Sequence, residues 1–263
     1  MERSDKMLSR KDGRVGTMIF NNPERHNAVS LEMWQAAAKI LRDFAADDEV
    51  RVVVLTGAGG KSFVSGADIS KFGDERATRE AVERYGAATE DVYAGLASLP
   101  KPTIAMIQGY CIGGGLSLAI CCDLRFCSQG SRFGLPAAKL GLGYGYPGLK
   151  RFIDTLGPTH TRDIFFSARQ FDAAEALAMG VVNRVLPDSD LASSVREYAE
   201  GVASNAPLTV EAIKRISLEV LKPESERDLK LAADLAARCF ASSDYAEGQQ
   251  AFLEKRKPVF TGK

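Results

Sequence analysis

The sequence predicts an α/β fold in which short buried strands alternate with helices and a region of helices alone follows. Apolar, β-branched runs such as residues 52–56 are separated by segments whose apolar residues keep helical spacing. From about residue 191 to residue 256 the strand signals stop. Of the 263 residues 45% are hydrophobic, enough for one large core. We expect a core over residues 1–190 and a helical region over residues 191–263.

Three strands and two helices are predicted in the first half of the chain. Residues 14–20 alternate well enough for a strand, residues 52–56 are typical of a strand covered on both faces, and residues 102–107 lead up to a row of glycines. Ser30 has the side chain of a helix N-cap, and apolar residues at helical spacing follow it. A second helix is predicted from about residue 76 to residue 96.

The second half of the chain predicts helices that enclose a glycine-rich loop. Residues 131–148 hold so many glycines that a shaped loop is expected there. Gly180 has the position of a residue that ends a helix. The regular elements expected around these features are helices over residues 116–122, 149–167 and 172–180, and strands over residues 124–127 and 181–185.

Two glycine-rich loops, residues 57–69 and the triple glycine at 113–115, are the first candidate functional features. Glycine permits a close approach of the backbone or a positive φ. The triple glycine precedes a predicted helix, whose first N–H groups lack partners and lie at the positive end of the macrodipole. Such a turn could hold an oxygen that becomes negative during a reaction. The plain alternative is a tight turn that binds nothing.

Charge and hydropathy exclude several classes of function. The 34 Lys and Arg residues balance the 34 Asp and Glu residues, so no overall field attracts nucleic acid or an anionic membrane. No apolar segment is long enough to span a bilayer, and the first residues lack the apolar core of a signal peptide. The five cysteines match no metal-binding spacing. We expect a cytoplasmic protein with buried reduced thiols and no metal site.

Six segments, taken together, resemble the crotonase superfamily, the enoyl-CoA hydratase/isomerase family. They follow one another in the order of that family, at residues 22–28, 53–57, 63–68, 109–115, 173–182 and 251–257. The resemblance implies a spiral of ββα turns and a C-terminal helical region, assembled as a homotrimer or a dimer of trimers. It also implies an acyl-CoA thioester as substrate, so that CoA belongs to the substrate and no separate cofactor is expected.

The same resemblance implies an oxyanion hole for the thioester oxygen, made by the backbone N–H groups of Ala67 and Gly114. Preorganised backbone donors suit an enolate, and one such donor can contribute about 2.7–4 kcal/mol. Asp68 follows directly in the sequence. We interpret it as structural rather than catalytic, because a charged carboxylate beside an oxyanion would oppose it.

The resemblance implies binding positions for CoA at both ends of the chain. Those near the nucleotide and the first glycine-rich loop are Arg25, Ser65, Asp68 and Ile69. Phe252 and Lys255 match C-terminal positions that reach the CoA of a neighbouring subunit. For the basic run at residues 255–257 the alternative is a solvated helix end.

Both glutamates of the family hydratases are missing. Hydration of a 2-enoyl thioester needs one group to activate water and one to protonate Cα, and carboxyl groups suit both tasks. The matching positions hold Ser117 and Ala137, and residues 133–148 contain no Asp or Glu. Alanine cannot move a proton, and serine is a poor acid or base unless another group activates it.

The glycine-rich loop at residues 131–148 contains Tyr144 but none of the carboxylates that a hydratase would need. Residues 140–144 resemble the corresponding loop of methylmalonyl-CoA decarboxylases, where a tyrosine occupies the matching position. Loss of carbon dioxide from a malonyl-type thioester forms the enolate directly, with no general base. A phenol could orient the leaving carboxylate or stand near the protonation step. The alternative is that Tyr144 forms an aromatic wall of the acyl pocket.

Three functions therefore compete. The leading hypothesis is a lyase that decarboxylates a malonyl-type acyl-CoA, with Ala67, Gly114, Ser117 and Tyr144 at its site. The second is a 2-enoyl-CoA hydratase or isomerase that uses a relocated acid such as Asp74 or Glu75. The third is a catalytically silent acyl-CoA-binding protein; the zero net charge argues against RNA as its partner.

Overall fold

The main sheet of the computed structural model has six strands in the order β1-β2-β3-β5-β7-β10. The structure describes residues 5–75 and 77–263, and the side chains at 69, 72 and 74 lie outside the description. β1 pairs antiparallel with β2, and the other neighbours pair parallel. The strands are β1 (Met7–Asp12), β2 (Val15–Phe20), β3 (Val52–Gly57), β5 (Thr103–Ile107), β7 (Leu124–Ser128) and β10 (Arg184–Leu186).

A second sheet of four short strands was not predicted from the sequence. Its order is β4-β6-β8-β9, with β4 at Ser62–Val64, β6 at Tyr110–Ile112, β8 at Arg132–Gly134 and β9 at Gln170–Asp172. Three residues are too few to show a period, so these segments read as loops. β1 and β2 both belong to the main sheet, and each of the next three strand pairs, β3 with β4, β5 with β6 and β7 with β8, gives one strand to each sheet before a helix follows. This is the ββα spiral that the resemblance implied.

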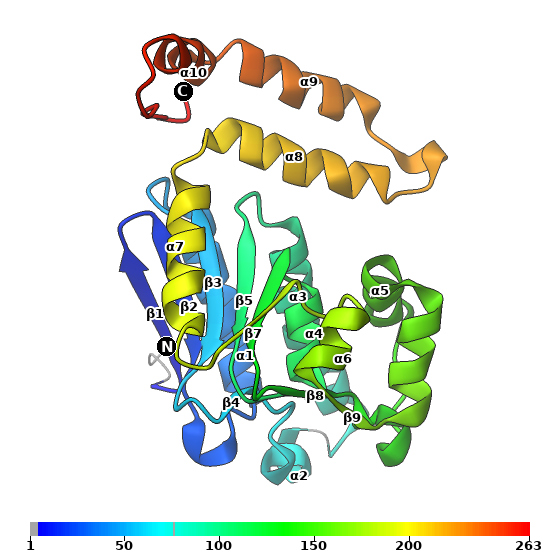
Figure 1. Ribbon diagram of the computed structural model, residues 1–263. Helices are drawn as coiled ribbons and strands as arrows, with labels where there is room; N and C mark the ends of the chain where they lie inside the picture. The colour runs from blue at the N-terminus through cyan, green and yellow to red at the C-terminus, as the bar shows by residue number, and fades with distance from the viewer. Residues whose placement is uncertain (1–4, 76) are drawn as a thin grey trace.

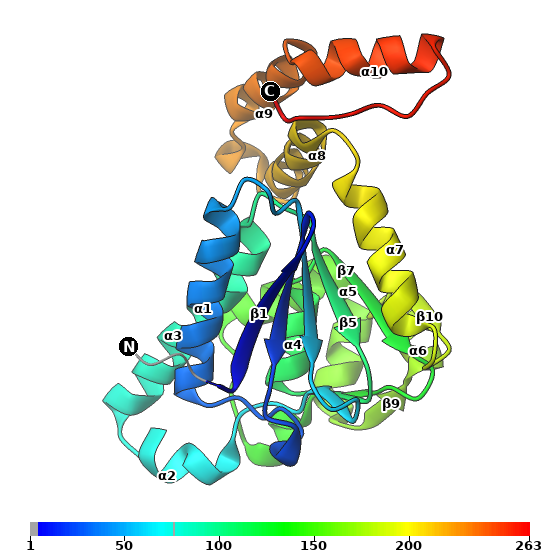
Figure 2. The same ribbon diagram turned by 90° about the vertical axis from the view of Figure 1, so that its left-hand side faces the viewer.

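Helices cover both faces of the main sheet. Figure 2 shows α1 (Leu31–Ala46) and α3 (Arg79–Ser98) on one side and α7 (Leu191–Ala203) on the other. On the α7 side, Leu191 and Val195 pack with Val52 and other strand residues. The remaining elements of the core are α2 (Phe72–Glu75), α4 (Gly114–Ile120), α5 (Tyr146–Ser167), α6 (Ala173–Ala178) and the 3-10 turns Pro23–Arg25, Ile69–Lys71 and Pro136–Leu140.

Local signals placed several helix ends correctly. Ser30 caps α1, because its Oγ accepts a hydrogen bond from the Met33 N–H at 3.4 Å. Gly180 takes a positive φ of 76° just after α6, as expected of a residue that ends a helix. Several element starts differ from the prediction: α3 begins at Arg79 rather than at about residue 76, and α5 at Tyr146 rather than at residue 149. The α4 helix starts at Gly114, inside the glycine row, and β10 starts three residues later than predicted, because Val181 and Val182 are buried before the strand begins.

The C-terminal helices form a layer of their own at one end of the spiral (Figure 1). They are α8 (Pro207–Val220), α9 (Leu229–Phe240) and α10 (Ser243–Leu253), with a 3-10 turn at Glu224–Glu226. The last residues run back along α10 (Figure 2), where the buried Asp244 carboxylate accepts the N–H groups of Thr261 at 2.7 Å and Gly262 at 2.8 Å. Within the described residues no helix is long and apolar enough to cross a membrane. The division at residues 190 and 191 stays a prediction.

We predict that Gly115→Ala destabilises the protein by about 1–3 kcal/mol, the usual range for overpacking. A β carbon at Gly115 would lie 2.0 Å from the backbone oxygen of Val64, so α4 or β4 must shift. Alanine in a helix interior would otherwise be favoured by roughly 0.5–1 kcal/mol. Urea unfolding measures the change. The matched control is Gly143→Ala, where nothing lies within 4 Å of the added carbon; equal stability of both variants would contradict the prediction.

Candidate active site

The two glycine-rich loops lie side by side because the strands that lead into them are neighbours. β4 and β6 pair in parallel, so their carboxyl ends meet at the same edge of the small sheet. A β carbon built at Gly113 or Gly114 would lie 3.9 or 3.8 Å from the Cα of Gly66. Gly66 and Gly113 both have positive φ, 104° and 56°. Glycine at positions 66 and 113 therefore supplies the positive φ of the two turns.

The direction of two backbone N–H groups follows from the hydrogen bonds of their own peptide units. In a trans peptide the N–H points opposite to the C=O. The Gly66 carbonyl accepts the Val29 N–H at 2.9 Å, so the Ala67 N–H points away from Val29. The Gly113 carbonyl accepts the Ser117 N–H at 3.1 Å, so the Gly114 N–H points out of the start of α4. Two fixed donors on adjacent loops can hold an oxygen that gains negative charge.

Ser117 and Tyr144, predicted separately from the sequence, touch each other. Their hydroxyl groups lie 3.1 Å apart, and either oxygen can donate. Ser117 is buried on α4, and its Oγ also lies 3.4 Å from the Gly113 carbonyl. The Tyr144 ring packs edge-on against Phe165, with 4.9 Å between ring centroids. The structure thus places a pair of hydroxyls one helical turn from the Gly114 N–H.

Tyr93 of α3 belongs to the same neighbourhood and was missed in the sequence. Its hydroxyl donates to the Gly114 carbonyl at 2.9 Å. Burial, and secondarily the nearby Tyr144, raise the pKa of Tyr93 well above its usual value, so it stays a donor. In the sequence Tyr85 and Tyr93 only mark one stripe of a helix, which is the usual pattern of a core-facing residue. That shared stripe was the one available signal.

A carboxylate approaches from α2. Glu75 is partly buried, and its Oε1 accepts the Leu31 N–H at the start of α1 at 3.1 Å. Its Oε2 is buried and has no hydrogen-bond partner among the residues that the structure describes. Leu31 lies two residues after Val29, which bridges to Ala67. Glu75 is thus held next to the strand that fixes the first loop. Asp74, the other acid considered, has a side chain outside the described residues.

The positions expected to bind CoA near the nucleotide come together. Arg25 donates to the Ser70 hydroxyl at 2.8 Å, and that hydroxyl donates to the Asp68 carboxylate at 2.6 Å. Ser65 adjoins them, with its N–H 3.2 Å from the His26 carbonyl. The buried Asp68 also accepts the Ser70 N–H, which suits a structural role. Ile69 has a side chain outside the described residues.

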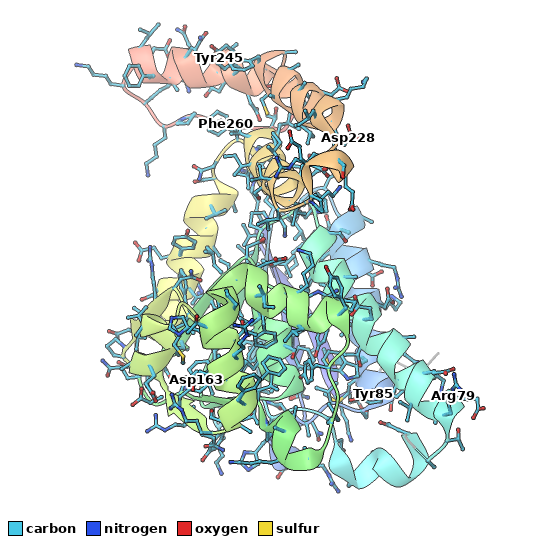
Figure 3. All side chains as sticks on the ribbon, turned by 90° about the vertical axis from the view of Figure 1, so that its right-hand side faces the viewer. Arg79, Tyr85, Asp163, Asp228, Tyr245 and Phe260 are labelled. Atoms are coloured by element: carbon cyan, nitrogen blue, oxygen red, sulfur yellow. The ribbon has the colours of Figure 1, made fainter. Side chains whose placement is uncertain are left out.

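Phe252 and Lys255 lie far from that group within one chain. Both are exposed on or after α10, with 84% of Phe252 accessible. A cavity of about 590 Å³ opens beside Phe252, between α8, α9, α10 and the tail, and Tyr245 and Phe260 are among its lining residues. Figure 3 shows Tyr245 and Phe260 at the opposite end of the molecule from Tyr85. The cavity is therefore not part of the site at the glycine loops.

Comparison with known proteins identifies the family. A family model described as Enoyl-CoA hydratase/isomerase matches residues 10–263. The chain belongs to the enoyl-CoA hydratase/isomerase family. A short-chain-enoyl-CoA hydratase of Clostridium acetobutylicum is 34% identical to this family member, over 98% of this chain and 97% of the relative. A crotonyl-CoA hydratase of Syntrophomonas wolfei is 32% identical, over 98% and 99%.

Solved structures of the family agree with the architecture. The crystal structure of an enoyl-CoA hydratase/carnithine racemase from Magnetospirillum magneticum superimposes with a TM-score of 0.94 at 36% identity, covering 98% of this chain and 96% of the other. The predicted fold class, an α/β crotonase-like spiral with C-terminal helices, is confirmed. No group of three His, Cys, Asp or Glu side chains in the described part of this family member is placed to hold a metal ion.

We predict that only Cys239 reacts quickly with a coloured disulfide reagent in the folded protein at about pH 8. Burial raises the pKa of Cys121 and Cys127 to about 12, and it raises those of Cys111 and Cys122 as well. The thiolate is the reactive form, so these four thiols stay inert below that range. Cys239 is partly exposed. Rapid reaction of several thiols before unfolding would contradict the prediction; all five should react in denaturant.

Proposed function

We propose that this protein hydrates a short-chain 2-enoyl-CoA thioester and catalyses the reverse dehydration. The relatives named as short-chain-enoyl-CoA and crotonyl-CoA hydratases cover almost the whole chain and support this alternative over the decarboxylase first favoured from the sequence. In this proposal Arg25, Ser65 and Asp68 contact the CoA portion. Phe252 and Lys255 do so from a neighbouring subunit of a trimer or a dimer of trimers.

The reaction places one negative charge where the two loops meet. Water adds its oxygen to Cβ, the C=C electron pair moves toward the thioester oxygen, and the enolate then takes a proton at Cα. The N–H groups of Ala67 and Gly114 hold the thioester oxygen, and their fixed peptide units require no reorganisation as the charge grows. One group must still take the proton from water and deliver one to Cα.

Glu75 is the group we assign to this proton transfer, and its buried Oε2 without a partner is the observation that carries the proposal. The Leu31 N–H holds Oε1, which leaves Oε2 for a water molecule. Oε2 takes a proton from that water and returns one to Cα, so the proton balance closes with a single carboxyl group. Glu90, by contrast, forms an ion pair with Arg151.

We predict that Glu75→Gln lowers kcat for hydration of crotonyl-CoA by about 10²- to 10⁴-fold, the usual contribution of general acid–base catalysis. KM should change little, because the amide fills the same space without moving a proton. The reaction is measured by the loss of absorbance of the enoyl thioester. The control is Glu83→Gln, an exposed α3 glutamate paired with Arg79. Full hydratase activity in Glu75→Gln would rule out this role.

Decarboxylation remains the second candidate, favoured by the Ser117 and Tyr144 hydroxyl pair. In that reaction the bond from Cα to the carboxylate breaks and carbon dioxide leaves. The electron pair of the broken bond stays on the thioester and forms the enolate, whose oxygen the Ala67 and Gly114 N–H groups hold. Tyr144 would orient the carboxylate before it leaves. No carboxylate of the protein is needed, because the bond cleavage itself supplies the electrons.

We predict that a decarboxylase would lose about tenfold or more in kcat/KM for methylmalonyl-CoA in Tyr144→Phe, the scale of one lost hydrogen bond to a charged group. Release of carbon dioxide measures it. Tyr146→Phe, at the exposed first residue of α5, serves as control. Turnover of crotonyl-CoA by the wild type with no decarboxylation of any malonyl thioester would exclude this candidate.

A further inference from the structure

We propose that three buried aromatic residues, Trp34, Tyr85 and Tyr93, are positioning residues that set the distance and direction of the Ala67 and Gly114 N–H groups. This inference rests on the proposed function, in which those two groups bind the thioester oxygen. The three side chains, called here the aromatic brace, come from α1 and α3. They join the two glycine loops by an unbroken series of hydrogen bonds and ring contacts, and none of them was singled out in the sequence.

The first contact of the brace is to Val29, which forms an isolated parallel bridge with Ala67. The Tyr85 hydroxyl donates to the Val29 carbonyl at 3.0 Å. Val29 in turn forms hydrogen bonds on both sides of Ala67. Its N–H donates to the Gly66 carbonyl at 2.9 Å, and its carbonyl accepts the Asp68 N–H at 3.0 Å. A displacement of Val29 would therefore turn the peptide unit that carries the Ala67 N–H.

The middle of the brace is Trp34, of which only 1% is exposed. Its indole Nε1 donates to the Tyr85 hydroxyl at 2.9 Å. That hydroxyl accepts one hydrogen bond and donates another, so its proton has a defined direction. The indole ring packs edge-on against Tyr93, with 5.6 Å between centroids and 82° between planes. Edge-to-face packing of this kind fixes the orientation of both rings.

The last contact reaches the second loop. The Tyr93 hydroxyl donates to the Gly114 carbonyl at 2.9 Å, one peptide unit beyond the Gly114 N–H. A β carbon built at Gly114 would lie 3.5 Å from that hydroxyl and 3.9 Å from the Trp34 ring. Glycine has no side chain to limit its φ and ψ. The Tyr93 hydrogen bond adds a restraint on the peptide unit that follows Gly114, beside the hydrogen bonds of the first turn of α4.

The test compares Tyr85→Phe and Tyr93→Phe with the wild type. Each variant keeps the ring; Tyr85→Phe removes the hydrogen bonds to Trp34 and Val29, and Tyr93→Phe removes the one to Gly114. Tyr198→Phe is the control, because Tyr198 lies on α7 and its ring packs against Phe126, away from the glycine loops. The probe is a cinnamoyl-CoA thioester, whose absorbance moves to longer wavelength when its carbonyl oxygen is polarised. Steady-state kinetics with crotonyl-CoA gives kcat and KM, and circular dichroism with thermal unfolding confirms the fold.

We expect a smaller wavelength shift in both brace variants and a fall in kcat of about tenfold, since small misplacements of catalytic groups cost up to about 10²-fold. KM should stay within roughly twofold, and the double variant should lose less than the product of the single losses because one connected unit is broken twice. A merely structural role would lower thermal stability without changing the shift of the bound probe.

Two results separate the failure of this inference from failure of the proposed function. If the wild type shifts the probe and the brace variants shift it equally with unchanged kcat, the brace has no positioning role and the proposed function stands. If the wild type binds the probe without any shift, the two N–H groups do not polarise the thioester and the proposed function fails first. Should one variant unfold, the other decides the test.

Discussion

The parallel pairing of β4 with β6 is the constraint on which the site depends. It brings the ends of two short strands to one edge, where Gly66 and the triple glycine approach within van der Waals contact. Gly66 and Gly113 have the positive φ that glycine adopts readily, and at Gly115 even a methyl group would overlap the Val64 backbone. The small sheet therefore matters less for its few hydrogen bonds than for the place where it ends its strands.

Hydrogen bonds fix the direction of one backbone N–H group in each of the two loops. Each of the two N–H groups belongs to a peptide unit whose carbonyl is already held, one by Val29 and the other by the first turn of α4. A pair of donors fixed before substrate arrives is what an enolate requires. In the proposed function the surrounding side chains decide which reaction forms the enolate, and the groups present are the hydroxyls of Ser117 and Tyr144 and the carboxylate of Glu75.

Local sequence signals predicted the features that depend on neighbouring residues. The Ser30 cap, the buried run of β3 and the glycine after α6 all follow from side chains within a few positions. The three-residue strands of the small sheet did not, because their pairing partners lie some fifty residues away. The motif resemblance supplied Ala67 and Gly114, whereas Tyr93 and the partnerless oxygen of Glu75 required tertiary structure. The absence of both glutamates favoured decarboxylation because the sequence names Asp74 and Glu75 as possible relocated acids without showing where their carboxylates lie.

The use of backbone donors has a consequence for how such a protein can change. A mutation replaces a side chain but leaves the N–H of every residue except proline in place. A change of the Ala67 side chain, or of Ser117, Ala137 or Tyr144, therefore leaves both N–H groups present, while their direction depends on the surrounding glycines and the aromatic brace. In the proposed function, oxyanion binding therefore depends on the backbone conformation. Side chains beside it can change and support a new reaction while the oxyanion is still bound.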